Sequence, residues 1–144
     1  MTDDSHFVNL CPVFLTADIR KTVQYYVEKL GFHYAQHYDR IENFATIYRD
    51  EIEFIIVQAK KGEVLSNSVR YGAGYDAYID PATMDGIDLV FAEYESKGVK
   101  ILARPHETTY GSYEFVFEDC DGRQIGVGRI FDKATYFKDS DIEI

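Results

Sequence analysis

The chain has 144 residues, a length typical of a single domain that buries its core without disulfides or metals. Its formal net charge of -10 argues against nucleic-acid binding, because phosphate recognition needs a basic surface. No apolar run approaches the ~20 residues of a membrane helix, and the N-terminus does not resemble a secretory signal. We therefore expect a cytoplasmic protein that does not bind membranes, with Cys11 and Cys120 as free thiols.

The first half predicts one helix among four strands. Strands are expected over residues 7–16, 32–38, 44–48 and 52–58, with a tight turn at Asp50-Glu51 between the last two. Asp18 is a favourable N-cap, apolar residues follow at helical spacing, and Gly31 is placed to end the helix. Residues 60–74 show no periodicity and are interpreted as a loop between two halves.

The second half repeats this order. A strand over residues 75–79 precedes a helix between Asp85 and Gly98, and further strands follow over 99–103, 113–118 and 124–127. Asp85 follows Asp18 by 67 residues (85 − 18), and Gly98 follows Gly31 by the same 67 (98 − 31). The repeat predicts an α+β fold in one domain, with two βαβββ modules over residues 7–59 and 75–130 and a polar tail over 131–144. Each helix would cover one sheet face, and the other faces would form a concave trough.

The ordered set of motifs resembles the vicinal oxygen chelate superfamily, and within it the glyoxalase and bleomycin-resistance-like proteins. The likeness covers about residues 7–130 and is carried by these segments: Pro12-Val13-Phe14-Leu15 with Asp18, Tyr25-Tyr26, Leu30-Gly31-Phe32, Tyr110-Gly111, Glu114-Phe115 and Asp119-Cys120-Asp121-Gly122.

The resemblance implies a divalent metal in the enzymes of the superfamily, and it locates four ligand positions. These positions fall on Cys11, near Glu53, on Tyr78 or Asp76, and on Gly126. Glycine offers no side-chain ligand, and cysteine is a soft ligand among the imidazole and carboxylate groups of this family. None of the four histidines has the spacing of a metal pair. We expect no metal, no other cofactor and no catalytic residue.

Strand parity and turn counting predict which residues line the trough. Counting outward from the first turn pairs Tyr48 with Glu53 and leaves Phe54 under the helix. Counting from Asp121-Gly122 places aromatic side chains opposite Gly126 and Gly128. The predicted ligand-binding residues are Phe44, Thr46, Tyr48, Glu53, Ile55, Tyr113, Phe115 and Gln124; Val57 and Phe117 share their faces.

A trough of aromatic and few polar groups is typical of small-molecule sites. We expect a protein that binds and sequesters a planar or cationic ligand, as in antibiotic resistance, and the alternative is a metal-dependent lyase or dioxygenase of the same superfamily. The resemblance also implies a homodimer, because open strand edges and an apolar face invite pairing. Residues 8–15 and 75–79 are expected near that interface.

Overall fold

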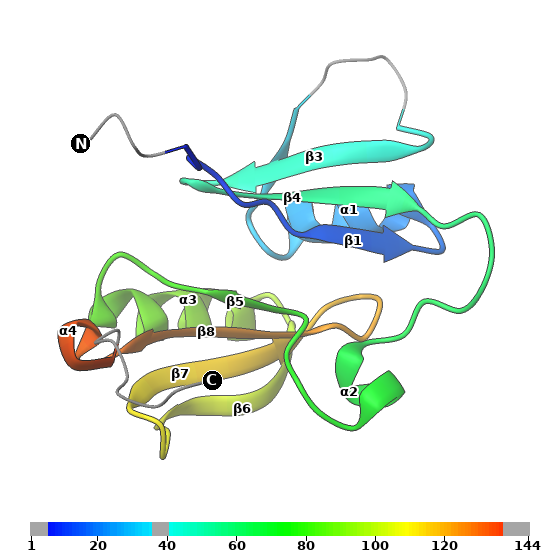
Figure 1. The fold of residues 1–144 in the computed structure, drawn as a ribbon. Coiled ribbons are helices and arrows are strands. Elements are labelled where there is room, and N and C mark those ends of the chain that lie inside the picture. Colours follow the sequence, from blue (N-terminus) through cyan, green and yellow to red (C-terminus); the bar gives the residue numbers. More distant parts are fainter. Residues whose placement is uncertain (1–5, 36–40, 137–144) are drawn as a thin grey trace, which may run out of the picture. The chain divides into compact units, whose positions relative to one another are not determined.

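A computed structural model describes residues 6–35 and 41–136, and the chain divides into two compact units, residues 1–64 and 65–144 (Figure 1). Unit 1 forms a four-stranded sheet of order β1-β4-β3-β2, in which β1 runs parallel to β4 and the other pairs are antiparallel. Its elements are β1 (Val13–Thr16), α1 (Ile19–Glu28), β2 (His33–Tyr34), β3 (Phe44–Arg49) and β4 (Ile52–Gln58).

Unit 2 repeats this topology with the strand order β5-β8-β7-β6 and a parallel pair formed by β5 and β8. The expected tandem βαβββ architecture is therefore confirmed. Its elements are α2 (Asn67–Tyr71), β5 (Ala77–Ile79), α3 (Met84–Ser96), β6 (Lys100–Glu107), β7 (Ser112–Glu118), β8 (Gln124–Ile130) and α4 (Lys133–Tyr136).

The long helices begin differently but end in the same way. The Asp18 carboxylate accepts a hydrogen bond from the Lys21 amide at 3.2 Å and caps α1 as predicted. In α3 the N-cap is Thr83, and Asp85 lies in the first turn, so the prediction of Asp85 as the cap was wrong. A carboxylate in the first turn still favours the helix through its dipole. Gly31 and Gly98 follow the two helices at positive φ, as the repeat predicted.

Each helix packs on one face of its own sheet through aromatic rings. In unit 1, Tyr26 of α1 packs edge-on against Phe54 of β4, with ring centroids 6.0 Å apart. In unit 2, Tyr94 of α3 packs edge-on against Phe117 of β7 at 5.0 Å. All four side chains are at most 2% exposed, so these contacts form the centres of two similar cores.

Several element bounds differ from the prediction. The first strand starts at Val13 instead of Phe7, and β6 continues to Glu107 past two register irregularities. The expected loop over residues 60–74 contains α2, which is capped by the Ser66 hydroxyl. The segment after residue 130 contains the short helix α4. Residues 36–38 of the second predicted strand and 137–144 of the tail lie outside the described residues. In the part of the chain that is described, no helix has the length and apolarity needed to cross a membrane.

Candidate ligand sites on the helix-free sheet faces

The helix-free face of unit 1 carries the predicted set of side chains. The ladder pairs Tyr48 with Glu53 and Thr46 with Ile55, as turn counting predicted, and Phe54 packs under α1. Phe44 and Tyr48 are 50% and 44% exposed although both lie within a strand. Because β1 runs parallel to β4 with Val13 beside Ile55 and Leu15 beside Val57, two further half-exposed aliphatic side chains share this face.

Glu53 is the carboxylate of this apolar face. The Asn9 side-chain amide donates to its Oε1, and the Cys11 thiol donates to its backbone carbonyl at 3.5 Å. Burial raises the pKa of the Cys11 thiol, and the negative charge of Glu53 raises it further. Cys11 is therefore held as a protonated thiol, whereas metal binding needs the thiolate.

The register of the second hairpin differs from the prediction by one residue. Glu114 pairs with Gly128 and Val116 with Gly126, where Tyr113 and Phe115 were expected. Phe115 is fully buried against Phe91 of α3 at 5.5 Å, and the Tyr113 hydroxyl donates to Asp88 of α3 at 2.7 Å. The predicted trough-facing placement of Tyr113, Phe115 and Phe117 was therefore wrong. Gln124 pairs with Glu118 and remains on the helix-free face.

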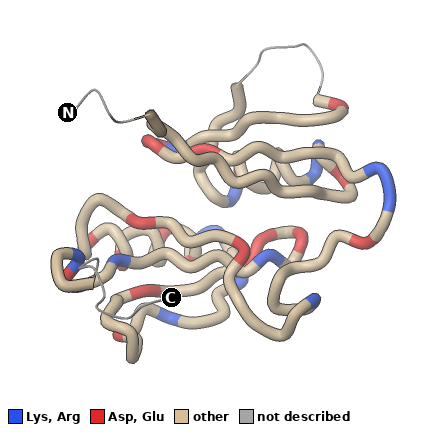
Figure 2. Tube along the Cα trace, viewed as in Figure 1, with Lys and Arg blue, Asp and Glu red and all other residues tan. Residues whose placement is uncertain are grey.

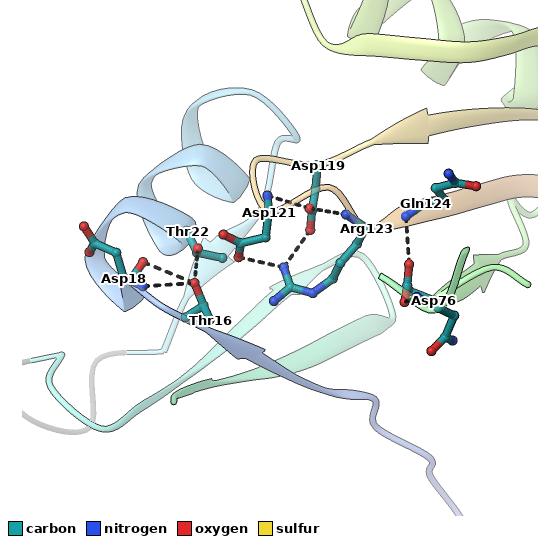
Figure 3. A network of polar contacts seen from close by, with 9 residues as sticks. Thr16, Asp18, Thr22, Asp76, Asp119, Asp121, Arg123 and Gln124 are labelled. Carbon is teal, nitrogen blue, oxygen red and sulfur yellow. Dashed lines mark hydrogen bonds and ion pairs between the residues drawn. The ribbon is translucent and has the colours of Figure 1, made fainter. Parts of the chain in front are cut away.

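The loop between β7 and β8 explains this shift (Figure 3). Asp119 Oδ1 accepts the amides of Asp121 and Arg123, and the Arg123 guanidinium donates to Asp119 at 2.8 Å and Asp121 at 2.9 Å. Arg123 is only 4% exposed and is held inside the loop instead of starting the return strand. The ladder accordingly resumes at Gln124, opposite Glu118, and every later pair moves by one position.

A cluster of hydroxyl groups around one carboxylate occupies the helix-free face of unit 2. Glu114 lies on β7 and is 1% exposed. Its Oε2 accepts the Tyr75 hydroxyl at 2.6 Å; its Oε1 accepts the hydroxyls of Tyr78 at 3.0 Å, Ser112 at 2.7 Å and Tyr110. We call these five residues the tyrosine–glutamate cluster.

Two glycines of β8 make room for the cluster. A Cβ atom at Gly126 would lie 2.8 Å from the Tyr78 ring and 3.2 Å from the Tyr75 ring. A Cβ atom at Gly128 would meet the Tyr78 hydroxyl, and the Glu114 Cβ at 2.5 Å. Aromatic rings do lie over these glycines, as expected, but they belong to Tyr75 and Tyr78 in the segment around β5. The predicted rings of β7 lie elsewhere.

The hydrogen bonds keep Glu114 ionised and the phenols neutral. Burial alone would raise the pKa of Glu114, but hydrogen bonds from Tyr110, Tyr75, Ser112 and Tyr78 outweigh burial and lower it from its ordinary value. Burial is the main cause that raises the pKa of Tyr75 and of Tyr110, and the hydrogen bond to this carboxylate is the second. Burial also raises the pKa of Tyr78. The face therefore carries one buried negative charge.

The implied metal positions do not form a donor set. Tyr78 lies beside Gly126 in the parallel ladder, and glycine has no donor atom. Both oxygens of the Asp76 carboxylate accept backbone amides, from Asn67 and from Gln124, each at 2.9 Å (the Gln124 bond is drawn in Figure 3). Among residues 6–35 and 41–136, no group of three or more His, Cys, Asp or Glu side chains is arranged to hold a metal ion. The residues present do not fit the metal site that the resemblance implies.

Along the part of the chain that the structure describes, the distribution of charged residues does not distinguish one site from another. Figure 2 shows Lys and Arg interspersed with Asp and Glu along the traces of both units. The distinguishing features are therefore local: an exposed aromatic face in unit 1 and a buried carboxylate under tyrosines in unit 2.

Sequence reasoning missed the cluster, although two signals pointed toward it. The chain has 12 tyrosines, more than a core uses readily, because each buried hydroxyl needs a partner. Gly126 and Gly128 alternate on one face of β8, and glycine inside a strand often marks a close approach of other groups. The cross-strand partner Glu114 could not be identified without the correct register.

One protein-family model matches most of this chain. A family model described as the glyoxalase/bleomycin resistance protein/dioxygenase superfamily matches residues 6–127. Among curated proteins, no sequence matches significantly.

Solved structures resemble the chain throughout most of its length. The crystal structure of TioX from Micromonospora sp. ML1 has a TM-score of 0.62 at 14% identity, covering 85% of this chain and 95% of that one. A glyoxalase/bleomycin resistance protein/dioxygenase from Alicyclobacillus acidocaldarius has a TM-score of 0.68 at 13% identity, covering 85% and 91%. A protein of the same description from Nocardioides has a TM-score of 0.63 at 12% identity, covering 98% and 93%. At these identities the likeness concerns the fold alone, whereas the family match spans most of the sequence: the chain belongs to the glyoxalase/bleomycin resistance protein/dioxygenase superfamily.

Proposed function

We propose that the protein binds a planar or cationic small molecule on the helix-free face of unit 1 and sequesters it without chemical change. The observation that carries this proposal is the exposure of Phe44 and Tyr48 on a strand whose other face forms the core. Exposed apolar surface on a folded unit commonly marks a binding surface. Aromatic rings can stack on a planar ligand, and Glu53 offers a carboxylate to its positive charge.

The test uses proflavine, a planar aromatic cation, titrated into the full chain with its fluorescence as the readout. Tyr48→Ala removes an exposed ring and is expected to weaken binding about fivefold or more, while stability changes by less than about 0.5 kcal/mol. Glu53→Gln is expected to weaken proflavine binding with a similarly small change in stability. Leu89→Ala is the control, because Leu89 is 70% exposed on α3. Equal affinity for proflavine in the unmodified chain and all three variants would contradict the proposal.

The alternative is a metal-dependent lyase or dioxygenase, the enzyme classes that the resemblance includes. Metal analysis of the purified protein separates it from sequestration. A stoichiometric transition metal that is lost together with an activity on chelation would establish the alternative. We propose no metal, because the donors at the implied positions do not fit one.

We also propose a cytoplasmic homodimer. Phe7, Val8 and Leu10 are at least 90% exposed next to β1, which is an edge strand of its sheet. Such a segment would gain apolar burial from a second copy of the chain. Light scattering at micromolar concentration should give twice the chain mass of 16.6 kDa, and a monomer would contradict the pairing.

A further inference from the structure

The tyrosine–glutamate cluster of unit 2 contains a negative charge that no described side chain neutralises. Glu114 is 1% exposed, and its four hydrogen-bond donors are neutral hydroxyls. Within residues 6–35 and 41–136 it forms no ion pair; His106, its cross-strand partner on β6, directs ring Nδ1 to the Arg104 carbonyl instead. The hydroxyls stabilise the ionised carboxylate, but they are neutral and leave its negative charge in place.

The rings that surround this charge are partly open to solvent. The rings of Tyr75 and Tyr78 stack with centroids 6.0 Å apart and an interplanar angle of 28°. They are 38% and 37% exposed, and Tyr110 is 49% exposed. Their hydroxyl ends meet at Glu114, so the outer parts of the rings remain available to a ligand. Aromatic faces attract cations, and a nearby carboxylate adds to that attraction.

The hydrogen bonds that Glu114 already accepts favour one class of cation. Oε1 of Glu114 already accepts three hydroxyls and Oε2 accepts one, which uses most of the acceptor capacity of the carboxylate. A metal ion would require several oxygen ligands in direct contact, and a primary ammonium would require acceptors for its three donors. A quaternary ammonium has no donors to satisfy, and aromatic rings with a negative field are its usual recognition surface.

The arrangement is built into the sheet. The Tyr78 side chain approaches β8 this closely only because positions 126 and 128 are glycines. Glycine within a strand costs stability and packs no side chain, so two of them on one face need a compensating role. We propose that the tyrosine–glutamate cluster is a binding site for a small organic cation of the quaternary ammonium class. This site belongs to unit 2 alone, and the proposal does not depend on the unit 1 face.

The experiment titrates choline into the full chain labelled at its tyrosine rings and follows the ring resonances by NMR. Choline is expected to shift the resonances of Tyr75, Tyr78 and Tyr110 saturably. Its neutral isostere 3,3-dimethylbutan-1-ol is expected to bind about tenfold more weakly or worse, because it lacks the charge. No saturable shift, or equal binding of the two compounds, would overturn the proposal without any variant.

Variants assign the effect to the cluster. Glu114→Gln is expected to weaken choline binding about tenfold, and Tyr75→Leu, which removes a partly exposed ring, by about fivefold. Glu63→Gln removes an equal charge at an exposed position of unit 1 and should leave the affinity unchanged. If Glu114→Gln does not fold, Tyr75→Leu carries the test, and unchanged affinity in that variant would overturn the proposal. Loss of proflavine binding in Tyr48→Ala with choline binding intact would separate the two sites.

Discussion

The two units have the same topology and similar cores, but they differ on the faces that the helices leave uncovered. Under the helices, Phe54 in unit 1 and Phe115 in unit 2 are both at most 2% exposed among other aromatic rings. On the helix-free faces, unit 1 exposes Phe44 and Tyr48, whereas unit 2 buries the Glu114 carboxylate beneath tyrosines. The need to pack a helix constrains one face of each sheet and leaves the other free to diverge toward binding.

The largest expected losses of stability come from removing the buried aromatic rings of the two cores. Phe54→Ala and Phe115→Ala are each expected to lower the free energy of unfolding by about 3–5 kcal/mol, because each leaves a cavity among buried rings. Urea denaturation of each variant measures this change. Tyr48→Ala, on the exposed face of unit 1, is the matched control and should cost less than about 0.5 kcal/mol.

Similar losses at positions 54 and 115 would support two equivalent cores. A loss below about 1 kcal/mol for Phe115→Ala would mean that this ring lies on the helix-free face. The register of β7 and β8 would then be the one that turn counting predicted.

A smaller effect is expected from a test of the two helix-free faces, in which one methyl group is added to the face of unit 2. Gly128→Ala would bring a Cβ atom within 2.7 Å of the Tyr113 carbonyl and against the cluster, so we expect a loss of about 1–3 kcal/mol. Val13→Ala, on the half-exposed face of unit 1, should change the free energy of unfolding by less than about 0.5 kcal/mol. Thermal unfolding of both variants makes the comparison, and a neutral Gly128→Ala would contradict the close packing of Tyr78 over β8.

Local sequence signals were sufficient to predict the fold and the register of the first hairpin. Asp18, Gly31 and Gly98 marked helix ends, and the two-residue turn at Asp50-Glu51 set the register of β3 and β4. In the second hairpin, side-chain contacts within the loop set the register instead. The buried Arg123 guanidinium binds two carboxylates inside the loop, and an Asp-Gly step alone does not reveal that partnership.

The candidate site of unit 2 could not be predicted without the correct register of β7 and β8. Once the register moved by one residue, Glu114 lay opposite Gly128 on the helix-free face, where Tyr113 was expected. The tyrosines that reach it come from positions 75, 78 and 110, which no periodicity connects. The unit 1 residues Phe44, Thr46, Tyr48, Glu53 and Ile55 were placed correctly on one face, and their role in ligand binding stays a prediction.

The charge state of Glu114 has a consequence for stability. Because its folded pKa is lowered, its contribution to stability is present above the ordinary glutamate pKa of about 4.3 and is lost as the pH falls through the folded value.

The most direct measurement is an NMR pH titration of the Glu114 side-chain carboxyl carbon in the full chain. We expect a midpoint below the ordinary value of about 4.3, because four hydroxyls stabilise the ionised form. A midpoint above that value would mean that burial outweighs the four hydroxyls, which would contradict the stabilisation of the ionised form. A midpoint above neutral pH would leave the helix-free face of unit 2 with no charge with which to attract a cation.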